Sequence, residues 1–114
     1  MMRKPRRVPW YWRARSFGAQ PILVTRLSRI TLFQDPNQRA IADRLRRQQL
    51  ALNSPGFPVI DAAAVLDDPA HPGAYKPGLS ADGVHPNLEG HAVVAALLTP
   101  ILRNLLSEAA GRPD

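Results

Sequence analysis

Residues 21–33, PILVTRLSRITLF, begin with an unbroken apolar and β-branched run at residues 22–25. Runs of this kind, without polar alternation, are typical of strands that are covered on both faces. Residues 57–66, FPVIDAAAVL, contain a second short apolar run, which ends near Asp61. Residues 34–53 lie between the two runs and have helical spacing. The order strand, helix, strand predicts a crossover connection and a parallel sheet.

The helix expected between these strands has an apolar side and a charged side. The apolar side contains Ile41, Ala42, Leu45 and Leu52, whereas the charged side contains Arg39, Asp43, Arg46 and Arg47. We interpret the charged side as a solvated face, on which Asp43 and Arg47 can pair one turn apart.

The second half of the chain reads as a loop followed by a long helix. Residues 67–81, DDPAHPGAYKPGLSA, include three Pro and two Gly, which predicts a segment without regular structure. Asn87 is a suitable N-cap for the helix that follows, and Pro100 is expected to kink or restart that helix. No internal repeat is identified. The helix has an apolar stripe of Leu88, Ala92, Ala95, Leu98, Leu102 and Leu105 or Leu106.

The charge distribution separates a basic tail from a neutral body. The chain has 114 residues, enough for one small domain, and a formal net charge of +6. Six of the fifteen basic residues lie within residues 1–15, and all nine acidic residues lie beyond residue 16. Residues 1–20 also mix Pro with Trp and Tyr and show no periodicity, so we expect a disordered or non-homologous tail. Residues 109–114 are expected to be a flexible C-terminus.

Composition also excludes several classes of protein. The absence of Cys excludes a disulfide scaffold and a thiolate metal site. The N-terminal segment is basic but lacks the apolar run of a signal peptide, and we expect no transmembrane segment. The default localisation is therefore cytoplasmic.

Residues 79–91, LSADGVHPNLEGH, carry the clearest chemical signal. Asp82 precedes His85 by three residues, and Gly83 between them permits the positive φ that a tight turn requires. In such a turn the carboxylate can hold Nδ1–H of the imidazole, leaving Nε2 free to act as a base. Pro86 then restricts the backbone that leads into the final helix. The pattern indicates the acid and the base of an acyl-transfer triad.

The phrase DGVHPNLEGHAVVAALL, which begins at Asp82, resembles the C-terminal block of the SGNH hydrolases, the GDSL-type esterases and lipases. The resemblance runs from Pro21 to Leu106: PILVT is similar to the family's fourth strand, NQRAIADRL to the next helix and FPVIDAAAVL to the fifth strand. It implies a partial flavodoxin-like three-layer α/β/α domain over residues 21–108, with parallel strands and only the C-terminal half present. It also implies ester hydrolysis with Asp82 as triad acid, His85 as base, and no metal or cofactor.

The family's nucleophile and oxyanion blocks do not occur in this sequence. The Gly-Asp-Ser block and the blocks that supply Gly and Asn donors are absent, and none of the serines has the glycine context of an exposed nucleophile. These serines are Ser16, Ser28, Ser54, Ser80 and Ser107. We therefore expect a fragment of an ester hydrolase, inactive alone, that needs an N-terminal half to act on an ester substrate. An exposed sheet edge would favour self-association or such a partner.

Two other functions are compatible with the same residues. The basic tail in residues 1–15 could bind nucleic acid or anionic surfaces, although the neutral body makes nucleic acid an unfavoured partner. A metal-dependent hydrolase could use Asp82, His85 and His91 as ligands. His71 is interpreted as a loop residue, and Asp61 as a strand-end residue that bonds the following loop.

Overall fold

A pair of short parallel strands lies at the centre of the molecule. The computed structural model describes residues 9–111, and in it β1 (Leu23–Val24) pairs in parallel with β2 (Val59–Ile60). Leu23 lies opposite Val59 in this pair. The predicted parallel pairing is confirmed, and within the described residues β1 has no strand on its other edge.

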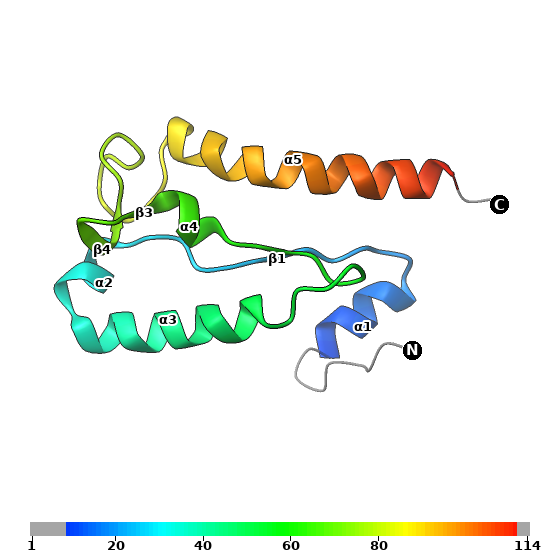
Figure 1. Cartoon of the computed structure of the whole chain (residues 1–114), viewed down its shortest axis with the longest axis horizontal. Coiled ribbons are helices and arrows are strands. Elements are labelled where there is room, and N and C mark those ends of the chain that lie inside the picture. Colours follow the sequence, from blue (N-terminus) through cyan, green and yellow to red (C-terminus); the bar gives the residue numbers. More distant parts are fainter. Residues whose placement is uncertain (1–8, 112–114) are drawn as a thin grey trace.

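Helices lie on both sides of these strands. In Figure 1, α3 (Pro36–Leu50) runs along one side of the strand pair and α5 (Leu88–Ala110) along the other. The structure is thus of the mixed α/β class, whereas the partial flavodoxin-like three-layer domain stays a prediction. The other elements are α1 (Pro9–Ser16), α2 (Ile30–Gln34), α4 (Ala62–Leu66), β3 (Asp67–Asp68) and β4 (His71–Tyr75).

Part of the expected irregular tail is helical and packed. Residues 9–16 form α1, and Tyr11 on this helix is only 2% exposed. Its ring packs at a tilt against Phe57 with a centroid separation of 4.4 Å, and its hydroxyl donates to the carbonyl of Gly56. The expectation of disorder for residues 9–16 is therefore corrected, because a contact distant in the sequence orders a segment that lacks its own periodicity. Residues 1–8 lie outside the described residues.

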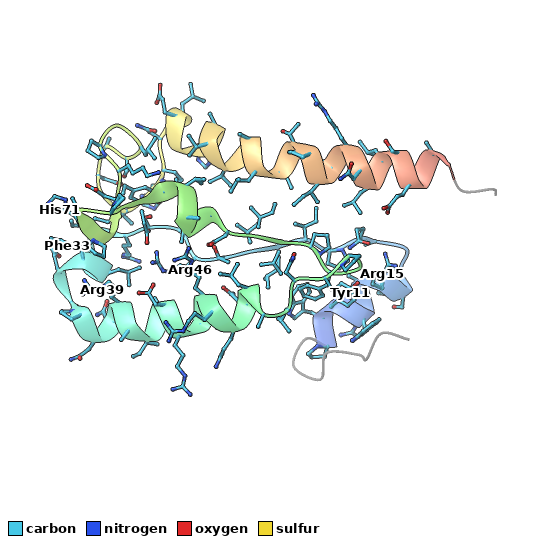
Figure 2. All side chains as sticks on the ribbon, viewed as in Figure 1. Tyr11, Arg15, Phe33, Arg39, Arg46 and His71 are labelled. Carbon is cyan, nitrogen blue, oxygen red and sulfur yellow. The ribbon has the colours of Figure 1, made fainter. Side chains whose placement is uncertain are left out.

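The apolar side predicted for the helix that forms α3 is only partly covered: Ala42 and Leu52 are half-buried, and Leu52 packs on the cluster of Tyr11 and Phe57. Ile41 is 72% exposed and Leu45 is 52% exposed, so neither packs in the core. Arg46 points from α3 toward the strands instead, and its side chain is 26% exposed (Figure 2). The interpretation of the charged side as a solvated face is therefore wrong for Arg46 and for Asp43, which is also half-buried.

Ion pairs to the strand ends explain this orientation. Asp43 does not require its expected partner Arg47, because Asp43 Oδ1 lies 2.9 Å from a guanidinium nitrogen of Arg26, just after β1. Arg46 makes a two-point contact with Asp61 after β2, at 2.8 and 2.7 Å. Charges that are partly removed from water require such partners, so Arg46 and Asp43 point inward, whereas Arg47 stays exposed.

Residues 67–81 contain regular structure where none was expected. β3 pairs antiparallel with β4, with Asp67 opposite Tyr75 and an irregularity between the two residues of β3. Gly73 adopts a φ of +94°, and the N–H of Lys76 donates to Leu66 O at 2.8 Å. The Pro and Gly residues therefore shape a tight, irregular hairpin, and only the chain after Tyr75 is a loop.

The final helix begins as predicted. The side chain of Asn87 accepts a hydrogen bond from the N–H of Gly90 at 2.9 Å, which confirms the N-cap. The helix continues through Pro100 as one element, so the expected restart is not observed. Its C-terminal turn reaches Ala110, within the segment expected to be flexible, while residues 112–114 lie outside the described residues.

The core consists of two buried clusters, and α5 packs on the one that does not contain Tyr11. Its Val93 and Val94 contact a buried cluster that contains Leu66 and Tyr75. By length and composition alone, α5 could also cross a membrane, which differs from the expectation that no stretch approaches a span. Core helices of soluble proteins meet the same criterion, so α5 by itself assigns no membrane location, and the absence of a transmembrane segment stays a prediction.

Candidate functional site

The turn at residues 82–85 brings a carboxylate and an imidazole together. Oδ2 of Asp82 lies 2.8 Å from Nδ1 of His85, so the expected contact is present. The other oxygen, Oδ1, accepts the backbone N–H groups of Val84 and His85, each at 2.8 Å. Gly83 adopts a φ of +76°, as predicted from its place in the turn.

The turn is held by the surrounding elements. The hydroxyl of Tyr75, at the end of β4, donates to Val84 O at 3.2 Å. The N–H of Ile30, at the start of α2, donates to Gly83 O at 2.8 Å. Ser80 Oγ donates to His85 O at 2.6 Å. Three separate segments therefore position the backbone of this turn.

A close approach of the chain fixes the turn against α5. Gly90 is buried in the first turn of that helix, where an added Cβ would lie 2.5 Å from Leu79 O and 2.9 Å from Cβ of Pro86. The N–H of Asn87 also donates to Leu79 O at 2.9 Å. Only glycine allows this packing, which places His85 immediately before the helix.

Hydrogen bonds favour the ionised form of Asp82. The side-chain hydrogen bond with His85, together with the backbone N–H groups of His85 and Val84, holds the pKa of Asp82 well below its ordinary value. In a neutral imidazole, a carboxylate at Nδ1 favours the proton on that nitrogen, which leaves the lone pair on Nε2. The side chain of His85 is 79% exposed, which leaves Nε2 accessible.

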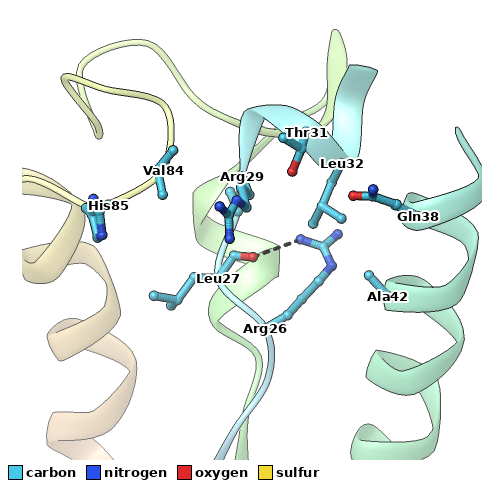
Figure 3. A pocket seen from close by; sticks show the side chains of 10 residues that line it. Arg26, Leu27, Arg29, Thr31, Leu32, Gln38, Ala42, Val84 and His85 are labelled. Carbon is cyan, nitrogen blue, oxygen red and sulfur yellow. Dashed lines mark hydrogen bonds between the residues drawn. The ribbon is translucent and has the colours of Figure 1, made fainter. Parts of the chain in front are cut away.

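His85 lies at the edge of an open cleft of about 660 Å³. Figure 3 shows the cleft between the 82–85 turn, the segment from β1 to α2, and the first half of α3. Its polar lining includes Arg26, Ser28, Arg29, Thr31, Gln38 and His85. The cleft lies beyond the carboxyl end of β1, where parallel sheets commonly bind ligands.

The hydroxyls of Ser16, Ser28 and Ser80 form hydrogen bonds with other groups of the protein. Ser28 lines the cleft, but it is 1% exposed and donates to Asp67. Ser80 donates to the carbonyl oxygen of His85, and Ser16 donates to Arg13 O at 2.6 Å. The described residues thus bring together an acid and a base, and these three serines do not complete a triad.

Below the cleft, polar residues at the strand ends form a second network. Asp61 accepts hydrogen bonds from Arg46 and, at 2.9 Å, from Thr25 Oγ1. Burial alone would raise the pKa of Asp61, but these hydrogen bonds outweigh it and lower the pKa. Asp61 therefore bonds the side chain of Thr25, just after β1, and that of Arg46 on α3, while its carbonyl oxygen accepts from the N–H of Ala64. In the described structure, Asp61 thus joins the end of β1 to α3.

Arg26 and Arg29 were missed as cleft residues by sequence reasoning. Arg26 contacts both oxygens of Asp67, at 3.0 and 2.7 Å. Arg26 directly follows the apolar run that forms β1, and Arg29 lies three residues further along the chain. The available signal was the position of these charges at the carboxyl end of a predicted parallel strand.

The metal-dependent alternative has no geometric support. Within residues 9–111, no group of three or more His, Asp, Glu or Cys side chains is arranged to hold a metal ion. His91 is exposed on α5 and does not form such a group with Asp82 and His85. The structure thus brings Asp82 and His85 together but does not recruit His91.

No family model, curated protein or solved structure matches the chain. The resemblance to the SGNH hydrolases therefore depends on the Asp-x-x-His-Pro turn and its position before the final helix.

Proposed function

We propose that this chain is the C-terminal part of an ester hydrolase of the SGNH type, supplying the acid and the base of a catalytic triad. His85 would accept the proton of a serine hydroxyl as that oxygen attacks the ester carbonyl. Asp82 would hold the imidazole and stabilise the imidazolium. The nucleophile and the oxyanion donors would come from an N-terminal half.

One observation carries the proposal. Asp82 Oδ2 lies 2.8 Å from His85 Nδ1, and His85 borders a cleft at the carboxyl end of a parallel strand. The acid therefore contacts one ring nitrogen and leaves the other free, on a residue that borders a space that a substrate can enter. A capping role alone would not require the imidazole to border a cleft.

The open edge of β1 offers a place for the missing half. Val24 on this strand is 42% exposed, and Ile41 and Leu45 of α3 are exposed as well. An unpaired strand edge and uncovered apolar side chains favour association with further strands and helices. An N-terminal half that pairs with β1 would extend the sheet next to the cleft.

Complementation tests the proposal. The chain is co-expressed with an N-terminal segment of a related SGNH hydrolase that carries the Ser, Gly and Asn blocks, and hydrolysis of short-chain nitrophenyl esters is measured. We expect no turnover above background for the chain alone, because a base without nucleophile or oxyanion donors cannot form an acyl-enzyme. The complemented pair should hydrolyse the esters.

Substitutions in the complemented pair separate chemistry from packing. His85→Ala should abolish activity, whereas Asp82→Asn should leave a residue of it, since the base remains but its tautomer and charge are no longer supported. Size exclusion establishes that each variant still associates with the N-terminal segment. Equal activity of wild type and His85→Ala in an intact complex would reject the proposal.

A further inference from the structure

Two arginines line the cleft beside His85, and they differ in whether a carboxylate neutralises them. Arg26 is neutralised by two carboxylates, Asp43 and Asp67, at 2.9 and 2.7 Å. Arg29 is exposed, and within residues 9–111 no carboxylate lies within ion-pair distance of its guanidinium. None of the residues that line the cleft is acidic. Arg29 is therefore the cleft's uncompensated cation.

The backbone holds Arg29 at a defined place. Its N–H donates to Gly73 O at 2.8 Å, and the N–H of the next residue, Ile30, donates to Gly83 O at 2.8 Å. Residues 29 and 30 are thus tied both to β4 and to the turn that carries His85. In Figure 3 the side chains of Arg29 and His85 border the same cleft from neighbouring segments.

The rest of the lining suits an organic ligand. Leu27, Leu32 and Val84 provide apolar surface in the cleft, and Thr31 and Gln38 provide neutral polar groups. A cleft of about 660 Å³ falls within the ordinary size range of small-molecule sites. A guanidinium without a protein partner matches a carboxylate, which it can bind through two parallel hydrogen bonds.

We propose that Arg29 forms an anion subsite beside His85 and that the cleft binds esters carrying a free carboxylate, such as monoesters of short dicarboxylic acids. The guanidinium would hold the carboxylate while the apolar lining covers the short carbon chain. The ester part of this inference rests on the proposed function, whereas binding of the carboxylate to Arg29 does not.

A binding experiment on the full chain tests the subsite. Monomethyl succinate and the neutral ester methyl butyrate are each titrated into ¹⁵N-labelled protein, with the arginine Nε–H resonances observed by NMR. We expect saturable shifts of the Arg29 resonance with monomethyl succinate, weaker binding at higher salt, and no comparable shift with methyl butyrate. Arg29→Gln should weaken binding of monomethyl succinate by about tenfold or more.

Arg44 provides the matched control. It is exposed on α3, does not line the cleft, and like Arg29 has no ion-pair partner in the described part of the chain. Arg44→Gln should therefore leave binding unchanged. Equal weakening by Arg44→Gln and Arg29→Gln, or equal shifts with both esters, would mean that only net charge or apolar contact is involved and would overturn the inference.

Turnover in the complemented pair distinguishes this inference from the proposed function. Arg29→Gln should reduce kcat/KM for the carboxylate-bearing ester by a larger factor than kcat/KM for the neutral ester. If no ester is hydrolysed but Arg29 still binds monomethyl succinate, the proposed function fails and the anion subsite stands. If both esters are hydrolysed with an unaltered ratio in Arg29→Gln, the proposed function stands and the subsite fails.

Discussion

His71 Nδ1 lies 3.0 Å from Asp68 Oδ2, which is the same i,i+3 relationship that joins His85 to Asp82. Both pairs belong to an Asp-x-x-His-Pro sequence, DPAHP at residues 68–72 and DGVHP at residues 82–86. Sequence analysis identified no internal repeat and interpreted His71 only as a loop residue. The recurrence shows that an Asp–His contact is a property of the local sequence and is not by itself a catalytic signature.

The surroundings distinguish the two turns. The ring of His71 lies edge-on to Phe33, with a centroid separation of 5.0 Å, and both side chains lie at one end of the molecule (Figure 2). His85 instead borders the cleft, and its turn is held by Tyr75 and by the N–H of Ile30. The position of His85 beside the cleft, rather than its contact with Asp82, supports a catalytic role for His85.

The acid stability of the 82–85 turn provides a first prediction. The folded-state pKa of Asp82 is lowered, so its ionised form stabilises the fold fully above the ordinary carboxyl pKa of about 3.9, and this contribution is lost as pH falls toward the folded value. The difference in unfolding free energy between wild type and Asp82→Asn should narrow as the pH falls below about pH 4.

Urea unfolding followed by circular dichroism at each pH measures this difference. Asp61 and Asp68, whose pKa values are also lowered, are present in both proteins, so their contributions cancel. A difference that stays constant to about pH 2 would contradict the assigned role of the Asp82 carboxylate.

A second prediction concerns Gly83. Alanine at this position must adopt a φ of +76°, and its Cβ would lie 3.2 Å from Cβ of Ile30. Positive φ alone costs a non-glycine residue about 1 kcal/mol. Gly83→Ala should therefore lower the unfolding free energy by more than this amount and weaken the contact between Asp82 and His85, as measured by NMR.

Gly78 is the control for backbone strain. Its φ is +85°, and no atom lies within 4 Å of an added Cβ. Gly78→Ala should show the conformational cost without the steric contact, so its effect should be smaller than that of Gly83→Ala. Equal losses in the two variants would show that Ile30 does not constrain the turn.

The ion pair between Arg46 and Asp61 provides a third prediction. Their side chains are 26% and 24% exposed, and Arg46→Met would leave the Asp61 carboxylate with a hydroxyl partner, Thr25. Breaking a fully buried pair costs several kcal/mol, so for this half-buried pair we expect a loss of about 2 kcal/mol in unfolding free energy. Arg44→Met on the same helix should change it by less than about 0.5 kcal/mol. Equal effects of the two variants would contradict the structural role of the pair.

The same ion pair shows what sequence patterns could and could not predict. The parallel pairing of β1 with β2, the N-cap at Asn87 and the contact of Asp82 with His85 follow from local runs and short spacings, which leave a signal in the sequence. The inward orientation of Arg46 depends on Asp61, which is 15 residues away. Helical periodicity identifies a face but does not say which partners that face will meet.

The other differences between the expected and the observed structure also arise from contacts distant in the sequence. The α1 helix is ordered by packing of Tyr11 on Phe57, and no feature within residues 9–16 predicts that partner. The place of Arg29 beside the cleft depends on hydrogen bonds from residues 29 and 30 to the carbonyls of Gly73 and Gly83, which are distant in the sequence. The contact of Asp82 with His85 was thus predictable from one turn, whereas the cleft beside it was not.

The last prediction compares the two Asp–His turns. In the complemented pair, His85→Ala should abolish ester hydrolysis and His71→Ala should leave kcat unchanged, because only His85 borders the cleft. Both substitutions remove an exposed imidazole that contacts a carboxylate three residues earlier. His71→Ala therefore controls for the loss of such a contact in a turn. Urea unfolding of both variants establishes whether their stabilities are comparable. If His71→Ala abolished activity and His85→Ala did not, the catalytic assignment would move to residues 68–71, and the cleft beside His85 would lose its proposed role.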